Sequence, residues 1–226
     1  MDNRLTALLH LCDSLFPTGS YAHSDGLEAA VTFGAVQDAA GVRAWVDALV
    51  DDVFVHGDGP AARLAWSAFG DGCGRVLRVL DDEVYALRPS STARDASRSV
   101  GLRLLTTWQR LHPHPEVGAL LGATIAAPGW TLPVAFGVAC ASIRVGERAT
   151  LEAFLYSRVA ATASAAMRLL PVGQIEAHRI VAAAADRIPG VCDRVLRRRE
   201  RPGAFAPLID IAAMRQQYVR SRLFRS

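Results

Sequence analysis

The chain has 226 residues, of which 51% are hydrophobic and 21% are charged, and its formal net charge is +3. This length suits one large domain or two small ones with a sizeable core, and so mild a charge does not by itself indicate nucleic-acid binding. All 25 basic residues are arginine, and the absence of lysine excludes a Walker A phosphate loop, a Schiff base and a lysine general base.

Helical periodicity dominates the N-terminal half. Apolar residues recur every three or four positions over Leu5–Phe16, and Pro17 is expected to end this helix. The same spacing covers residues 42–53 and 76–87, and Pro60 stands where the first turn of another helix is expected. We therefore predict a series of amphipathic helices.

The pattern continues through the second half of the chain. Thr92 begins a sequence that resembles a capping box and precedes a long apolar stripe. Thr150 is expected to cap the next helix, which Pro171 ends, and a further helix is predicted over residues 174–187. Residues 131–136 are the only short strand candidate, and they contain a proline.

No linker or repeat divides the sequence. We predict an all-α fold: one globular multi-helix domain over residues 1–226, with roughly eight to ten helices and a partner-binding tail from about 215 to 226. Residues 117–143 carry no charge, but Pro128 and Pro133 interrupt them, so a buried helix pair is favoured over a membrane span.

The cysteines and the N-terminal sequence indicate where in the cell the protein is expected. The four cysteines are Cys12, Cys73, Cys140 and Cys192. They form no CxxC pair and have no second ligand at zinc-site spacing, so we interpret them as buried, reduced thiols. No signal peptide is evident, and a cytoplasmic protein with no membrane partner is expected.

Candidate catalytic and metal-binding residues are few. His112-Pro113-His114 offers two imidazoles, which nickel or zinc can bind, but only Glu116 is near and a solvent-exposed loop is favoured. His10 and Asp13 lie one helical turn apart without a specified nucleophile. Since no GxSxG, HExxH or paired-carboxylate motif occurs, we expect no catalytic residue, no metal site and no cofactor.

Two rival functions remain open at this stage. An enzyme would need a pocket with titratable groups of shifted pKa, which a sequence does not display. A nucleic-acid-binding protein could use a run of arginines near the end of the chain. These are Arg194, Arg197, Arg198, Arg199 and Arg201. Glu200 and Pro202 within and after the run favour a solvated helix end or a mobile loop.

Two segments have unusual compositions. Residues 16–28 place turn-forming residues among apolar ones, which a plain solvent loop does not need. At the C terminus, Leu223 and Phe224 stand between Arg222 and Arg225, whereas a chain end is normally polar and frayed. A partner's surface and intramolecular packing both explain these segments.

The first segment resembles a motif of the UreF family of urease accessory proteins, P-x-G-x-F-S-Y-S-x-G-L-E. The matching residues are Pro17, Gly19, Ser24, Gly26, Leu27 and Glu28. Tyr21, Ala22 and His23 replace the Phe, Ser and Tyr of the motif.

Further matches follow in family order. T-R-x-A-S resembles residues 92–97, P-V-A-F-G stands at 133–137, P-L-G-Q resembles 171–174, and S-R-L-F-R-S is complete at 221–226. Gln216 and Gln217 stand where the family commonly has His and Glu.

The resemblance implies an all-α homodimer that binds UreD (also called UreH) and, with it, recruits the GTPase UreG. That assembly delivers nickel to apo-urease and couples the GTP cycle of UreG to activation, so GTP and nickel belong to the partners, with no role for nucleic acid. The residues expected to bind partners are Pro17, Gly19, Tyr21, His23, Ser24, Gly26, Glu28, Arg222, Leu223, Phe224, Arg225 and Ser226.

Overall fold

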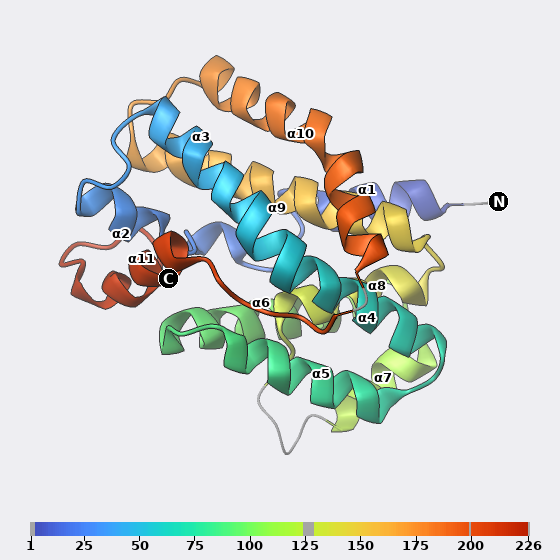
Figure 1. Cartoon of the computed structure of the whole chain (residues 1–226). Helices are drawn as coiled ribbons and strands as arrows, with labels where there is room; N and C mark the ends of the chain where they lie inside the picture. The colour runs from blue at the N-terminus through green and yellow to red at the C-terminus, as the bar shows by residue number, and fades with distance from the viewer. Residues whose placement is uncertain (1–2, 124–128, 199, 226) are drawn as a thin grey trace.

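The computed structural model describes residues 3–123, 129–198 and 200–225 of the chain. Helices account for most of them (Figure 1). The α-helices are α1 (Arg4–Cys12), α2 (Leu27–Thr32), α3 (Ala39–Ala48), α4 (Gly59–Gly70), α5 (Gly74–Leu87), α6 (Ser91–Leu111), α7 (Pro115–Gly122), α8 (Leu132–Ser142), α9 (Glu147–Leu169), α10 (Gln174–Arg197) and α11 (Pro207–Arg215). A π-helical stretch, η2 (Leu49–Asp58), joins α3 to α4, and short 3-10 turns are η1 (Ser20–Ala22) and η4 (Gln216–Tyr218).

The all-α prediction is confirmed. Because α3, η2 and α4 run on from Ala39 to Gly70 without a break, the described residues form about the predicted number of helices when that run counts as one. No strand occurs among them, and the strand candidate at 131–136 lies largely in α8. Its residues are almost all buried, so the uninterrupted apolar sequence is that of a helix enclosed on every side. None of the described helices is long and apolar enough to cross a membrane.

The core is built around α8 and α9. Helix α8 packs between α4 and α6, and α9 packs along α10. Gly137 lets α8 approach α4 closely, because a Cβ at that position would lie 2.3 Å from the Ala62 carbonyl oxygen. Large side chains such as Trp45, Trp108 and Phe154 fill the remaining space with at most 1% exposure.

Several helix ends differ from the predicted ones. Ser90, not Thr92, caps α6 by accepting a hydrogen bond from the backbone N–H of Ala93. Thr150 lies inside the first turn of α9, where its hydroxyl donates to the Gly146 carbonyl. Helix α1 ends at Cys12, before Pro17, as Asp13 accepts from the Leu15 N–H and turns the chain.

Helix α10 is longer than predicted and continues through Pro189. That proline lies on the exposed face, where water can hydrogen-bond the carbonyl that loses its N–H partner. The buried stripe of the helix passes from Ile188 to Val191 and Val195 without interruption. Burial of this stripe therefore outweighs the local cost of the proline.

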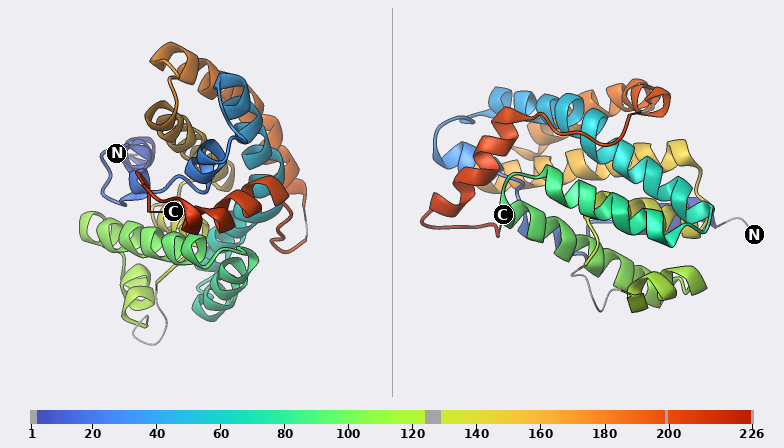
Figure 2. Two further views of the ribbon diagram at one scale, coloured as in Figure 1. Left: turned by 90° about the vertical axis from the view of Figure 1, so that its left-hand side faces the viewer. Right: turned by 60° about the horizontal axis from the view of Figure 1, so that its bottom comes forward.

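The fold brings the C-terminal end of the chain to the N-terminal motif. Helix α11 packs against α2, and the C terminus ends beside the loop that leads into α2 (Figures 1 and 2). Helix α1 begins at the opposite end of the molecule (Figure 1). The two unusual segments of the sequence therefore meet on one side of the protein.

Candidate partner-binding surface

Residues 16–28, the N-terminal segment, and residues 215–225, the tail, are joined by hydrogen bonds. The backbone N–H of Arg225 donates to the carbonyl of Ala22 over 2.8 Å. Leu223 and Glu28, which are also bonded, lie 195 positions apart in the sequence. Of the predicted partner-binding residues, Ser226 lies outside the described residues.

Glu28 is the centre of this junction. Its side chain is only 2% exposed. One carboxylate oxygen, Oε1, accepts from the Leu223 N–H over 2.5 Å. The other, Oε2, accepts from the Gln216 side-chain amide over 2.6 Å and from the Phe224 N–H over 3.3 Å. A buried carboxylate is tolerated because these donors replace water.

The tail presents its two apolar residues in opposite directions. Phe224 is 2% exposed and packs under the Arg168 guanidinium, whose central carbon lies 4.3 Å from the ring centroid. Leu223 is 61% exposed. Arg222 donates to the carbonyls of Val219 and Gln217 and so closes the turn that precedes Leu223 and Phe224. Phe224 thus packs within the chain, and Leu223 faces outward.

Gly26 and Ser24 shape the start of α2. Gly26 has φ = 89°, and a Cβ there would lie 2.8 Å from the backbone nitrogen of Ala213 on α11. Glycine is thus needed both for the left-handed turn and for the close approach of α11. The Ser24 hydroxyl accepts from the Glu28 N–H over 3.3 Å and satisfies a donor at the open end of the helix.

Three other predicted residues of the N-terminal segment lie nearer the surface. Pro17 is exposed, and Gly19 and His23 are half-buried. The backbone of Tyr21 lies between them in the turn η1. Burial lowers the pKa of His23; Asp25 opposes this effect, while the charges of Arg225 and two further arginines add to it.

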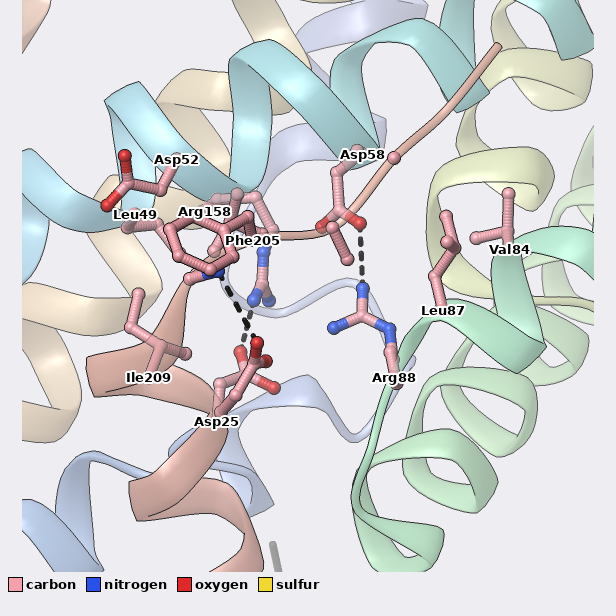
Figure 3. Close-up of a pocket in the computed structure, with 16 residues that line it drawn as sticks. Asp25, Leu49, Asp52, Asp58, Val84, Leu87, Arg88, Arg158, Phe205 and Ile209 are labelled. Atoms are coloured by element: carbon pink, nitrogen blue, oxygen red, sulfur yellow. Dashed lines mark hydrogen bonds and ion pairs between the residues drawn. The ribbon is translucent and has the colours of Figure 1, made fainter.

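One ion pair anchors the N-terminal segment to α9, and a second lies near it, between η2 and the end of α5. Figure 3 shows Asp25 paired with Arg158 of α9, and Asp58 paired with Arg88, which follows α5, at 2.8 Å. Burial raises the pKa of the Asp25 carboxyl, but the charges of Arg158 and Arg88 outweigh it and leave the pKa below its usual value. Asp25 therefore stays ionised and holds the segment against α9.

Sequence reasoning missed Asp25, Asp58, Arg88 and Arg158. Arg158 was detectable in principle, because it lies four residues after Phe154 and four before Thr162, on the apolar face of the helix predicted to follow Thr150. Its partner could not be identified, because helical periodicity says nothing about which distant loop meets the helix.

The pocket between these ion pairs is small. It has about 60 Å³ of internal space, enough for a few water molecules, and Phe205 lies over it (Figure 3). Its arginines are already paired with carboxylates, so they hold segments together instead of offering free charge to a substrate. This arrangement is suited to structural support.

The described residues contain no group of three or more His, Cys, Asp or Glu side chains that could hold a metal ion. His112 and His114 are half-buried, packed against Trp108 and Phe69, so the prediction of a solvent-exposed loop is wrong for these two rings. Two cysteines are buried and Cys12 is half-buried, whereas Cys73 is exposed, contrary to the predicted burial of all four.

The arginine run near the end of α10 is largely engaged in ion pairs. Arg194 pairs with Asp51, Arg198 with Glu200, and Arg201 with Glu83. Arg199 lies outside the described residues. Since paired arginines are poorer ligands for phosphates, the run gives little support to nucleic-acid binding.

Exposed apolar residues are concentrated along α11 and the segments on either side of it, and this set is called the patch. Its six members lie on α11, just before it, or on the tail, and each is between 41% and 80% exposed. They are Phe205, Leu208, Ile211, Met214, Tyr218 and Leu223. Sequence reasoning missed α11 and this patch, although the three-residue spacing of Leu208 and Ile211 was a usable signal. A concentration of exposed apolar residues on one element is typical of protein-binding surfaces.

A family model and the similar known proteins point to the same family. The UreF family model matches residues 36–185. Proteins named urease accessory protein UreF are similar along nearly their whole lengths. That of Arthrobacter sp. (strain FB24) is 33% identical, covering 97% of this chain and 96% of the relative. Those of Lachnoclostridium phytofermentans and Methylibium petroleiphilum are 29% and 31% identical, covering 100% and 98% of this chain, and 100% and 94% of the relatives.

Proposed function

The chain belongs to the UreF family of urease accessory proteins, and on that premise we propose that it is a non-catalytic scaffold for urease maturation. In this proposal it binds UreD (UreH), and the pair recruits UreG to apo-urease. The scaffold couples GTP hydrolysis by UreG to nickel insertion. GTP and nickel are bound by the partners, and the scaffold works in the cytoplasm as a homodimer.

The observation that carries the proposal is the surface formed by α11, the tail and the N-terminal segment. The apolar patch supplies area that a partner can bury, and Arg225, an exposed residue one position after Phe224, can donate to a partner's carboxylates. Because Asp25 ties the N-terminal segment to α9 and Glu28 ties the tail to that segment, the proposal has this surface organised before a partner arrives.

The lack of lysine supports the assignment of nucleotide chemistry to a partner. A Walker A loop needs its lysine to contact the nucleotide phosphates, and this chain has none. The scaffold can therefore act on the GTP cycle through contacts with UreG. We expect no GTP hydrolysis by the purified chain.

Co-purification with UreD tests the proposal. Ile211→Glu places a charge on α11, among the patch residues, at a position that is 51% exposed. The control is Val76→Glu in the first turn of α5, which is 52% exposed and lines a separate surface hollow with Leu64 and Ser67. With tagged UreD co-expressed, Ile211→Glu should reduce capture at least tenfold, the effect of losing a central interface contact. The control should bind like the unmodified chain, and equal capture of both variants would contradict the proposed surface.

A further inference from the structure

Glu28 is unusual because the polar groups around its buried carboxylate come from the tail. Among the described residues, its donors are the Gln216 amide and the consecutive N–H groups of Leu223 and Phe224. The nearby Ser24 hydroxyl accepts from the backbone N–H of Glu28. The carboxylate is thus committed to a segment that follows it by 188 to 196 positions.

Two consecutive N–H groups bound to one carboxylate fix the direction of the backbone. Successive backbone N–H groups can together form a concave site for an anion. This backbone direction places the two side chains on opposite sides of the tail. Phe224 enters the core beneath Arg168, and Leu223 remains 61% exposed. A shift by one residue would put Leu223 under the guanidinium and Phe224 in solvent.

We infer that Glu28 is a positioning residue for partner binding: its carboxylate holds the tail in one register and thereby keeps Leu223 and the flanking arginines outward. This inference rests on the proposed function and adds a specific role to one residue. It also predicts a tail that is ordered in the free protein, whereas amphipathic chain ends commonly fold only when a partner binds.

The hydrogen bonds from Glu28 to the tail are called the latch. They can be tested by exchanging the carboxylate of Glu28 with the amide of Gln216. The Gln216 Nε2 donates to Glu28 over 2.6 Å, and its Oε1 has no hydrogen-bond partner among the described residues. Glu28→Gln replaces one carboxylate oxygen by a donor that faces another donor, whereas Gln216→Glu brings two carboxylates together. In the double variant, the amide introduced at position 28 can donate to the carboxylate introduced at position 216, while its carbonyl still accepts from the tail.

Hydrogen exchange measures the latch without any partner. Each single variant should speed exchange at the Leu223 and Phe224 amides roughly tenfold or more, since each loses a bond to a charged group. The double variant should recover part of the protection. Glu83→Gln, which removes a surface partner of Arg201, is the control and should leave the tail unchanged. Unchanged tail exchange in Glu28→Gln, or a double variant no better protected than the worse single one, would overturn the inference.

Capture by tagged UreD separates the two proposals. We expect capture to fall in Glu28→Gln and Gln216→Glu and to recover in the double variant, in parallel with tail protection. If the tail is released but capture is unchanged, Glu28 is not a positioning residue for this partner, and the patch on α11 is judged by the Ile211→Glu result. If the unmodified chain fails to bind UreD although the exchange results hold, the proposed function fails and the latch remains.

Discussion

The core around α4, α6 and α8 and the junction between the N-terminal segment and the tail are held together differently. In the core, apolar side chains and closely approaching backbones dominate, as at Gly137. At the junction, a buried carboxylate, a glutamine and a few backbone N–H groups make the connection. The first kind of contact is distributed over many residues, whereas the second depends on a few polar groups. Changes at the junction should therefore act locally.

The largest effect is expected in the core. In Gly137→Ala the new Cβ would lie 2.3 Å from the Ala62 carbonyl oxygen, which cannot move without displacing α4. We expect a loss of about 3 kcal/mol in the free energy of unfolding, the upper range for overpacking. Thermal unfolding should then occur about 6–12 °C lower. An unchanged Tm would show that α4 and α8 can move apart at little cost.

A glycine change at the junction sharpens the contrast. Gly26→Ala combines a strained φ of 89° with a Cβ 2.8 Å from the Ala213 nitrogen. We expect a local cost of about 1–2 kcal/mol, relieved by movement of α11 away from α2. Hydrogen exchange should rise in α11 and the tail but not in α8. Equal acceleration in α8 would mean that the junction and the core unfold as one unit.

Helix periodicity explains which part of the fold could be predicted. The stripe from Val42 to Val53 and the proline at position 60 located the α3–η2–α4 run because burial of one face repeats with the helical turn. The motif match drew attention to Glu28 and Gly26. The bonds from Glu28 to Leu223 and from Asp25 to Arg158 were not predictable, because each joins distant residues whose meeting depends on how all the helices pack.

The pH dependence of the junction follows from His23. Burial and the nearby Arg225, Arg103 and Arg158 lower its pKa, against the effect of Asp25. Below about pH 6.5, the ordinary histidine value, the unfolded chain binds a proton that the folded site resists. The free energy of unfolding is therefore highest above that pH, where His23 is neutral in both states. It decreases as the pH falls toward the lowered pKa of the folded protein.

Tail exchange, corrected for the intrinsic effect of pH, should show this dependence. We expect protection to fall roughly threefold between pH 7 and pH 5.5, a modest change because water screens a half-exposed group. His23→Tyr should remove this component and leave only that of the carboxylates. An identical pH profile in the variant would assign the effect to another group.

The smallest effect is expected at position 216. In Gln216→His a ring N–H can replace the amide as donor to Glu28, and the amide oxygen that lacks a partner among the described residues disappears. Tail protection should stay the same or rise by up to about threefold. The exposed neighbour gives the control: Gln217→Glu loses only a surface hydrogen bond to the Met214 carbonyl and should leave tail protection unchanged. Release of the tail in Gln216→His would show that the junction requires the shape of glutamine.

Amide exchange of the unmodified chain alone and with UreD tests the central claim most directly. If the N-terminal segment and the tail form one surface before the partner arrives, the Leu223 and Phe224 amides will be protected in the free protein. Addition of UreD should then slow exchange further across α11 and residues 16–28. Tail amides that exchange at the rate of an unstructured peptide in the free chain, or protection by UreD that falls elsewhere on the molecule, would contradict the account.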